Sequence, residues 1–206
     1  MPTDSKRLII NCIGQAGSGK TTLAQKMDEV FGFHVYRPSS VISAYAVQHG
    51  MELQHRTDYI QCHDEMLRKD PEAMTRPIFE TTQPRIWIDG LRVPAHADIL
   101  KQKLGMYTLA LDAPPEVRLR NIMNAANTRG RNESHINTVG SLISEESADN
   151  NSSDPHTPNV NTIMEAADYT IYIDETTSLE TVHKLAVSAV EGWVHNYQSS
   201  ASANCP

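Results

Sequence analysis

The chain has 206 residues, of which 39% are hydrophobic and 21% are charged, and its formal net charge is −7. This composition is typical of one globular domain, and the negative charge argues against broad affinity for nucleic acid or an anionic membrane. No apolar run has the length of a membrane span, no signal-peptide region is visible, and the three cysteines have the wide spacing of free thiols, so we expect a cytoplasmic protein.

Short apolar runs alternate with segments of helical periodicity along most of the chain. In chain order the pattern predicts a strand at 7–13, a helix at 20–31, a strand at 34–36, a mainly helical segment at 39–80, a strand at 85–88, a helix at 94–105, a strand at 107–111, a helix at 114–127, a strand at 169–173 and a helix at 179–197. Such alternation predicts an α/β fold with a parallel sheet and helices on both faces.

Residues 127–161 differ from the rest because they are rich in Asn, Ser, Asp and Gly, with a helical island at 143–148. A long polar segment inside a compact domain is usually functional or mobile. We therefore expect a lid at about 127–158 that orders when ligands bind. The single domain is expected to cover 1–198, and the tail at 199–206 is expected to be disordered.

The strongest motif lies at residues 14–21, where GQAGSGKT fits the pattern GxxxxGK[ST] completely. It follows an apolar strand and opens a helix, which is the context that a phosphate-binding P-loop requires. Its glycines let successive backbone N–H groups point inward, and the helix N-terminus adds partial positive charge. We expect Lys20 to reach the β- and γ-phosphates of ATP and Thr21 to bind Mg²⁺. The predicted nucleotide-binding residues are Gly14, Gln15, Ala16, Gly17, Ser18, Gly19, Lys20, Thr21 and Thr22.

A second candidate is Asp89, which ends the short apolar run at 86–88. A Walker-B carboxylate occupies this place in P-loop proteins and supports the magnesium ion held by the loop, here by Thr21. Two alternatives remain at this stage. Asp89 could orient the acceptor hydroxyl as a base, or it could simply begin a turn, as Asp-Gly often does.

Arginines are further candidates for binding phosphate or the acceptor. Arg129 and Arg131 lie at the start of the polar segment, where a lid would bring positive donors to the migrating phosphoryl group, so we predict a catalytic role for both. Arg118 and Arg120 are two residues apart on one predicted helix, so at most one of them can face the site. The helical insertion at about 37–80 would bind the acceptor, and its candidate contacts are Arg37, Arg56 and Arg68.

With these pieces the chain resembles the nucleoside monophosphate kinase group of P-loop proteins, and most closely its dephospho-CoA-kinase-like and phage deoxynucleotide-kinase-like branch. The resemblance rests on the P-loop, on WIDGLRVP at 87–94, on VRLR at 117–120 leading to RGR at 129–131, and on later matches at 145–146 and 166–171. It implies a three-layer P-loop NTPase sandwich with a five-stranded parallel sheet in the order 2-3-1-4-5, an acceptor-binding insertion and a lid. It also implies that Asp89 supports magnesium and that Arg92 contacts the acceptor.

The predicted function is magnesium-dependent transfer of the ATP γ-phosphoryl group to a small nucleotide-like acceptor. Deoxynucleoside monophosphate, dephospho-CoA and a modified pyrimidine, free or within DNA, remain open as acceptors, although the acidic charge disfavours a polymer. The alternative is a P-loop switch or assembly ATPase that acts on a macromolecular partner. No residue offers itself as a covalent nucleophile, and the sequence makes no prediction about the oligomeric state.

Overall fold

The computed structural model describes residues 7–54, 56–125, 135–147, 150 and 152–202. At its centre lies a parallel five-stranded sheet in the order β2-β3-β1-β4-β5. Its strands are β1 (Leu8–Ile13), β2 (His34–Tyr36), β3 (Arg85–Asp89), β4 (Tyr107–Asp112) and β5 (Tyr169–Tyr172). The predicted fold class and strand order are therefore confirmed.

Nine helices occur in the described part of the chain. They are α1 (Lys20–Phe31), α2 (Pro38–Gln48), α3 (Arg56–Lys69), α4 (Arg76–Glu80), α5 (Pro94–Leu104), α6 (Pro115–Asn124), α7 (Val139–Ser147), α8 (Val160–Glu165) and α9 (Leu179–Ser202). No helix among the described residues combines the length and the apolar character that crossing a membrane needs.

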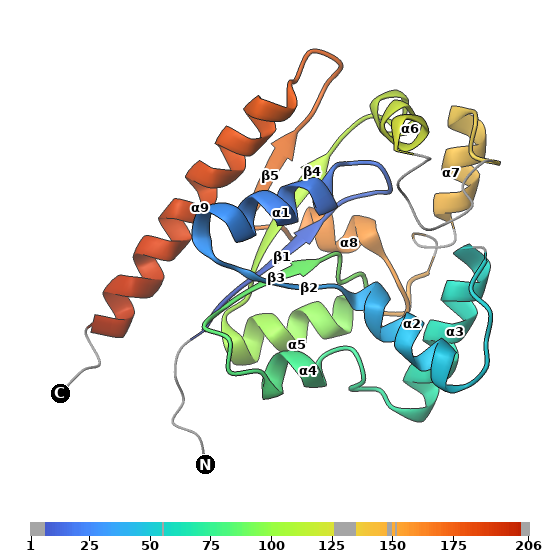
Figure 1. Ribbon diagram of the computed structural model, residues 1–206, viewed down its shortest axis with the longest axis horizontal. Helices are drawn as coiled ribbons and strands as arrows, with labels where there is room; N and C mark the ends of the chain where they lie inside the picture. Colours follow the sequence, from blue (N-terminus) through green and yellow to red (C-terminus); the bar gives the residue numbers. More distant parts are fainter. Residues whose placement is uncertain (1–6, 55, 126–134, 148–149, 151, 203–206) are drawn as a thin grey trace.

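Helices cover both faces of the sheet, so the molecule has three layers (Figure 1). On one face α1 and α9 pack over the sheet through the core that contains Ala24, Trp87 and Ala186. On the other face α4, α5 and α8 pack through the core that contains Ile78, Leu100 and Ile163. Strand β1 is buried on both sides because its residues alternate between these two cores, and this explains its nearly continuous apolar sequence.

The insertion between β2 and β3 has a small core of its own. Helices α2 and α3 pack against each other around Ile42, Ala46, Cys62 and Met66, beside the main domain in Figure 1. The predicted helical insertion is thus present as a distinct unit, and its role in acceptor binding stays a prediction. Cys12 and Cys62 are free, as the spacing of the cysteines predicted, and both are buried.

The polar segment is only partly within the described residues. Arg129 and Arg131 lie outside the described residues, so their predicted catalytic role stays a prediction. The described part is better anchored than its composition suggested, because Ile136 and Leu142 are buried against Ile122 of α6. Helix α7 covers residues 143–147 of the island predicted at 143–148 and starts four residues earlier than expected, while residue 148 lies outside the described residues.

Two features differ from the prediction at the C-terminal end. Helix α9 continues to Ser202, so residues 199–202 are helical and do not form the disordered tail expected at 199–206. A helix in progress can continue through Ser and Ala, since Ala is the best helix former and Ser costs little.

Helix α8 was not predicted, because six residues are too few to show a helical period. Its only local signal is Asn159, whose side chain caps it by accepting a hydrogen bond from the Thr162 N–H.

Candidate active site

The P-loop spans the gap between the end of β1 and the start of α1. Gly17 and Gly19 have φ values of 80° and 98°, a region that only glycine enters at low cost. Gly19 is the N-cap of α1, where no side chain caps the helix and the first turn holds no acidic residue. The first N–H groups of α1 are therefore not capped by a side chain and form a site that suits an anion.

Gly17 also lies too close to α6 for any side chain. A Cβ at this position would be 2.4 Å from the Arg118 carbonyl oxygen, whereas a Cβ at Gly105 would meet no atom within 4 Å, although Gly105 also has a positive φ of 65°. We therefore expect Gly17→Ala to destabilise the protein by about 3 kcal/mol and Gly105→Ala by about 1–2 kcal/mol, the cost of the backbone conformation alone. Urea unfolding of both variants measures the difference. Equal losses would show that the approach of α6 does not constrain the loop.

Lys20 folds back over the loop to which it belongs. Its Nζ donates hydrogen bonds to the carbonyl oxygens of Gly14 at 2.7 Å and Gln15 at 3.0 Å, and it lies 3.5 Å from the Ser18 hydroxyl. Its side chain passes next to Gly90, the glycine that follows β3. The positive charge is thus held at the mouth of the P-loop, at the carboxyl ends of β1 and β3.

Thr21 and Asp89 meet at the same place. The Thr21 hydroxyl donates a hydrogen bond to Asp89 Oδ2 at 3.0 Å, although 68 residues separate them. This contact arises because β1 and β3 are neighbouring parallel strands, so their carboxyl ends lie side by side. A hydroxyl and a carboxylate oxygen are ligands that suit Mg²⁺, which takes one or two protein oxygens together with phosphates and water. The residues present therefore fit the predicted metal.

Asn11 fixes the turn after β3, and sequence reasoning missed it. Its side-chain amide is fully buried, accepts a hydrogen bond from Leu91 N–H at 3.0 Å and donates one to Leu91 carbonyl at 3.3 Å. This two-way bond holds the chain immediately after Asp89 and Gly90. The available signal was a polar residue inside an apolar strand, since a buried amide must find hydrogen-bonding partners.

Cys12 lies in the floor of the site but does not act as a nucleophile. It is fully buried, and burial raises the pKa of its thiol far above the usual range, with Lys20 opposing the shift and Asp89 adding to it. The thiol is therefore protonated at neutral pH, and only a thiolate would attack.

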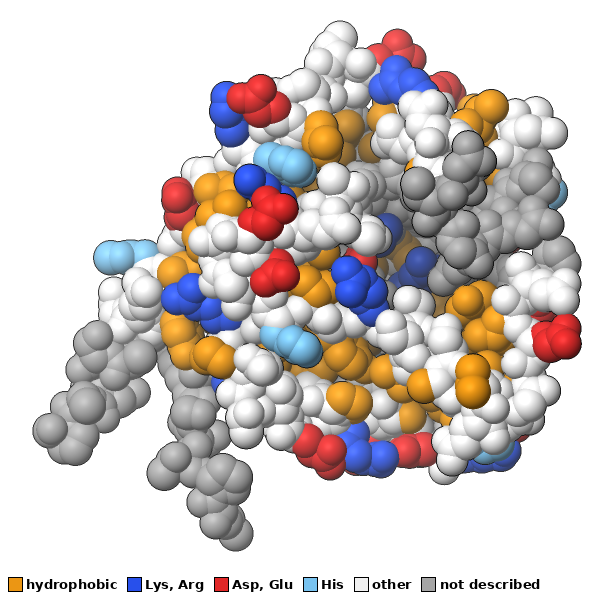
Figure 2. Space-filling view, in the orientation of Figure 1, with side chains coloured by type: hydrophobic (Ala, Val, Ile, Leu, Met, Phe, Trp, Pro, Cys, Tyr) orange, Lys and Arg blue, Asp and Glu red, His pale blue; other side chains and the backbone are white. Residues whose placement is uncertain are grey.

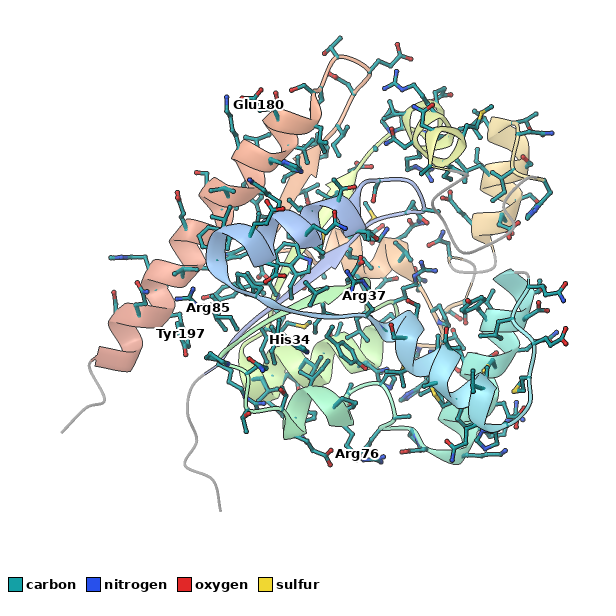
Figure 3. All side chains as sticks on the ribbon, viewed as in Figure 1. His34, Arg37, Arg76, Arg85, Glu180 and Tyr197 are labelled. Carbon is teal, nitrogen blue, oxygen red and sulfur yellow. The ribbon has the colours of Figure 1, made fainter. Side chains whose placement is uncertain are left out.

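Of the predicted arginines of the insertion whose side chains are described, Arg37 is the one that lies near Asp89. Its Nε lies 3.8 Å from Asp89 Oδ2, and its side chain is 42% exposed at the start of α2, as labelled in Figure 3. Figure 2 shows Lys and Arg side chains within a hollow of this face, beside the region of α2. Arg68 is exposed in the last turn of α3, and the side chain of Arg56 lies outside the described residues.

The remaining predicted arginines lie on other elements around the P-loop. Arg92 is half-buried just before α5, and its backbone oxygen accepts a hydrogen bond from Asn159 N–H. On α6 the side chain of Arg118 is buried and turned toward the P-loop, while Arg120 is exposed. The expectation that at most one of this pair faces the site is met, with Arg118 as that residue.

A family model named AAA_17 and described as an AAA domain matches residues 13–140, more than half of the chain. The chain belongs to this family. The match includes the whole P-loop and Asp89, so the predicted membership of the P-loop kinases is confirmed, while the finer resemblance to dephospho-CoA kinases and phage kinases stays a prediction.

Curated relatives of this chain include two cytidylate kinases. The chain is 35% identical over 91 residues to cytidylate kinase of Pyrococcus horikoshii and 36% identical over 84 residues to cytidylate kinase of Pyrococcus furiosus. These matches cover 44% and 40% of the chain, and 44% and 42% of the two kinases. The similarity thus spans less than half the length of the relatives.

Solved structures extend the similarity of fold over almost the whole chain. TT1252 from Thermus thermophilus has a TM-score of 0.57 at 17% identity, covering 91% of this chain and 97% of that one. Shikimate kinase from Acinetobacter baumannii, solved with shikimate, has a TM-score of 0.51 at 17% identity, covering 93% and 96%. At this identity the likeness shows the fold alone.

Proposed function

We propose that this P-loop family member catalyses magnesium-dependent transfer of the ATP γ-phosphoryl group to a small nucleotide-like acceptor. The observation that carries the proposal is the meeting of Lys20, Thr21 and Asp89 at the carboxyl ends of two adjacent strands, with Arg37 facing Asp89 from the insertion. The cytidylate kinases among the relatives support a nucleoside monophosphate as the first acceptor to test.

In this proposal the protein positions and neutralises charge and forms no covalent intermediate. An acceptor oxygen attacks the γ-phosphorus, and the bond to the oxygen that bridges to ADP breaks. The P-loop N–H groups and Lys20 would hold the phosphates, and Thr21 and Asp89 would hold Mg²⁺. When bound, the ion neutralises charge on the β- and γ-phosphates. Arg37 holds the acceptor, and Arg92, Arg129 and Arg131 are further contacts that we propose from the sequence.

A screen of acceptors with ATP and magnesium tests this function. Nucleoside and deoxynucleoside monophosphates, dephospho-CoA and an oligonucleotide with a modified pyrimidine are compared, and ADP release and phosphorylated product are read together. We expect one small acceptor class to accelerate ADP release and to gain phosphate in equal amount. Acceleration by a macromolecule without a phosphorylated product would instead support the switch ATPase.

The same assay tests Arg37. Because a charge-assisted hydrogen bond would be lost, Arg37→Met is expected to raise the KM for the acceptor about tenfold or more and to leave the KM for ATP unchanged. Arg76→Met is a matched control, since Arg76 is exposed on α4, pairs with Asp70 and lies away from Arg37 in Figure 3. Equal effects of the two variants on the acceptor KM would remove Arg37 from the site.

A further inference from the structure

Two side chains of α6 hold backbone carbonyls of the P-loop. Arg118 Nη1 donates to the Ala16 carbonyl at 3.4 Å, and Asn121 Nδ2 donates to the Gly17 carbonyl at 2.9 Å. In a trans peptide the C=O of one residue and the N–H of the next point in opposite directions. The bonds to α6 therefore turn the N–H groups of Gly17 and Ser18 away from α6. The Ser18 N–H donates to the Gln15 carbonyl at 3.2 Å within the loop, so the Gly17 N–H is the donor that these bonds aim toward a ligand. Backbone N–H groups of this loop are the donors that would meet phosphate.

Arg118 is in turn fixed by a residue of α7. Its guanidinium forms an ion pair with Glu146, and both side chains are only 6% exposed. Its Nε donates to the Ala113 carbonyl at 2.8 Å, so contacts on two sides orient the group that reaches Ala16. Glu146 is 28 residues away in sequence, and it is the acidic residue that α7 contributes to this buried pair.

A second set of hydrogen bonds connects α7 to Gln15, the residue before Ala16 in the loop. Asn150 Nδ2 donates to the Glu146 carbonyl at 3.0 Å, and Asn150 Oδ1 accepts from Asn161 N–H at 3.3 Å. Asn161 Oδ1 then accepts from Gln15 Nε2 at 2.8 Å. The segment after α6 is thus connected to P-loop residues 15 and 16 through two separate routes.

We infer that Glu146 is a positioning residue that sets the affinity of the P-loop for nucleotide by orienting Arg118. The inference rests on the proposed function only in taking nucleotide as the ligand. Holding α7 in place does not require the ion pair, because Leu142 and Ile136 already pack against Ile122. Buried ion pairs also add little net stability compared with apolar side chains of similar volume. The ion pair orients an N–H donor of Arg118 toward the Ala16 carbonyl, which a pair of apolar side chains cannot do.

The test compares three variants. Arg118→Met with Glu146→Leu replaces the ion pair with apolar side chains and keeps the packing, and Glu146→Gln keeps a hydrogen-bond acceptor without the charge. Glu145→Gln is the matched control, since Glu145 is the neighbouring residue of α7 and pairs with His135. Binding of ADP is measured by calorimetry, stability by thermal unfolding, and order of the loop by hydrogen exchange of residues 14–19.

We expect the apolar pair to bind ADP about tenfold more weakly, the consequence of losing roughly 1.4 kcal/mol of oriented hydrogen bonding, with a melting temperature close to that of the wild type. Residues 14–19 should exchange faster in this variant. Glu146→Gln should give a smaller loss in the same direction, and Glu145→Gln none. Wild-type affinity and exchange in the apolar pair would overturn the inference, because the ion pair would then be structural only.

Two other outcomes remain decisive. If the Arg118→Met, Glu146→Leu double variant does not fold, the comparison of Glu146→Gln with Glu145→Gln decides. Equal ADP affinity and equal hydrogen exchange in these two variants would also overturn the inference. If the wild-type protein binds no ADP, the proposed function fails, while hydrogen exchange at 14–19 still shows whether Glu146 orders the loop.

Discussion

Lys20→Ala is expected to lower kcat by a factor of about 10³ or more while the protein stays folded. The effect is large because Lys20 holds a full positive charge where negative charge is redistributed in the transition state, and removal of one such donor alone costs about 10²–10³ in kcat. The fold should survive, since Lys20 Nζ donates to carbonyl groups of its own loop and Lys20 belongs to neither core.

Lys26→Ala is the control for this variant. Lys26 lies on the same helix and pairs with Glu29 on the surface, so its loss should leave turnover within about twofold of the wild type. Turnover and thermal unfolding are measured together for both variants. Wild-type turnover in Lys20→Ala would exclude the P-loop as the site of phosphoryl transfer.

The second large effect concerns magnesium. We expect Thr21→Ala and Asp89→Asn each to raise the magnesium concentration needed for half-maximal activity by about 10- to 100-fold, because a lost metal contact or its supporting hydrogen bond costs about that much. The double variant should need little more magnesium than the single variant with the larger loss. Both residues act on one ion, and the effects of substituting residues in contact do not add.

Asp112→Asn is the matched control, because Asp112 ends β4, which lies on the other side of β1 from β3, and is exposed. Magnesium dependence of ADP binding, measured by calorimetry, gives a readout that does not depend on turnover. Losses that add fully in the double variant would indicate that Thr21 and Asp89 serve separate sites.

The elements that the sequence predicted well are those whose signal is local. The boundaries of α1 and β2 were predicted to the residue, because Gly19 and Gly32 bracket the first helix and Phe33 separates it from a short apolar strand. The P-loop carries its own chemistry within eight residues. Asp89 could be placed beside Thr21 because parallel strands end at one edge of the sheet, so a one-dimensional pattern was enough to predict a three-dimensional contact.

Contacts between distant residues were not predictable in this way. Helical spacing indicated that at most one of Arg118 and Arg120 faces the site, but only the packing of α6 against the P-loop selects Arg118. Glu146 carries no local sign of burial, since an acidic residue on a polar helix is usually exposed. The anchoring role of Ile136 and Leu142 was equally hidden, because two apolar residues in a polar segment form no period.

The C-terminal helix has a consequence for how the chain acquires its structure during synthesis. Residues Val182, Ala186 and Val190 of α9 complete the core that α1 shares with Trp87 and Leu111. The helix that presents the P-loop is therefore left with an open apolar side until residues 179–202 have left the ribosome. Domains are completed in the order in which the chain emerges, and exposed apolar surface in the meantime promotes aggregation. The P-loop is thus made well before the helix that completes its supporting layer.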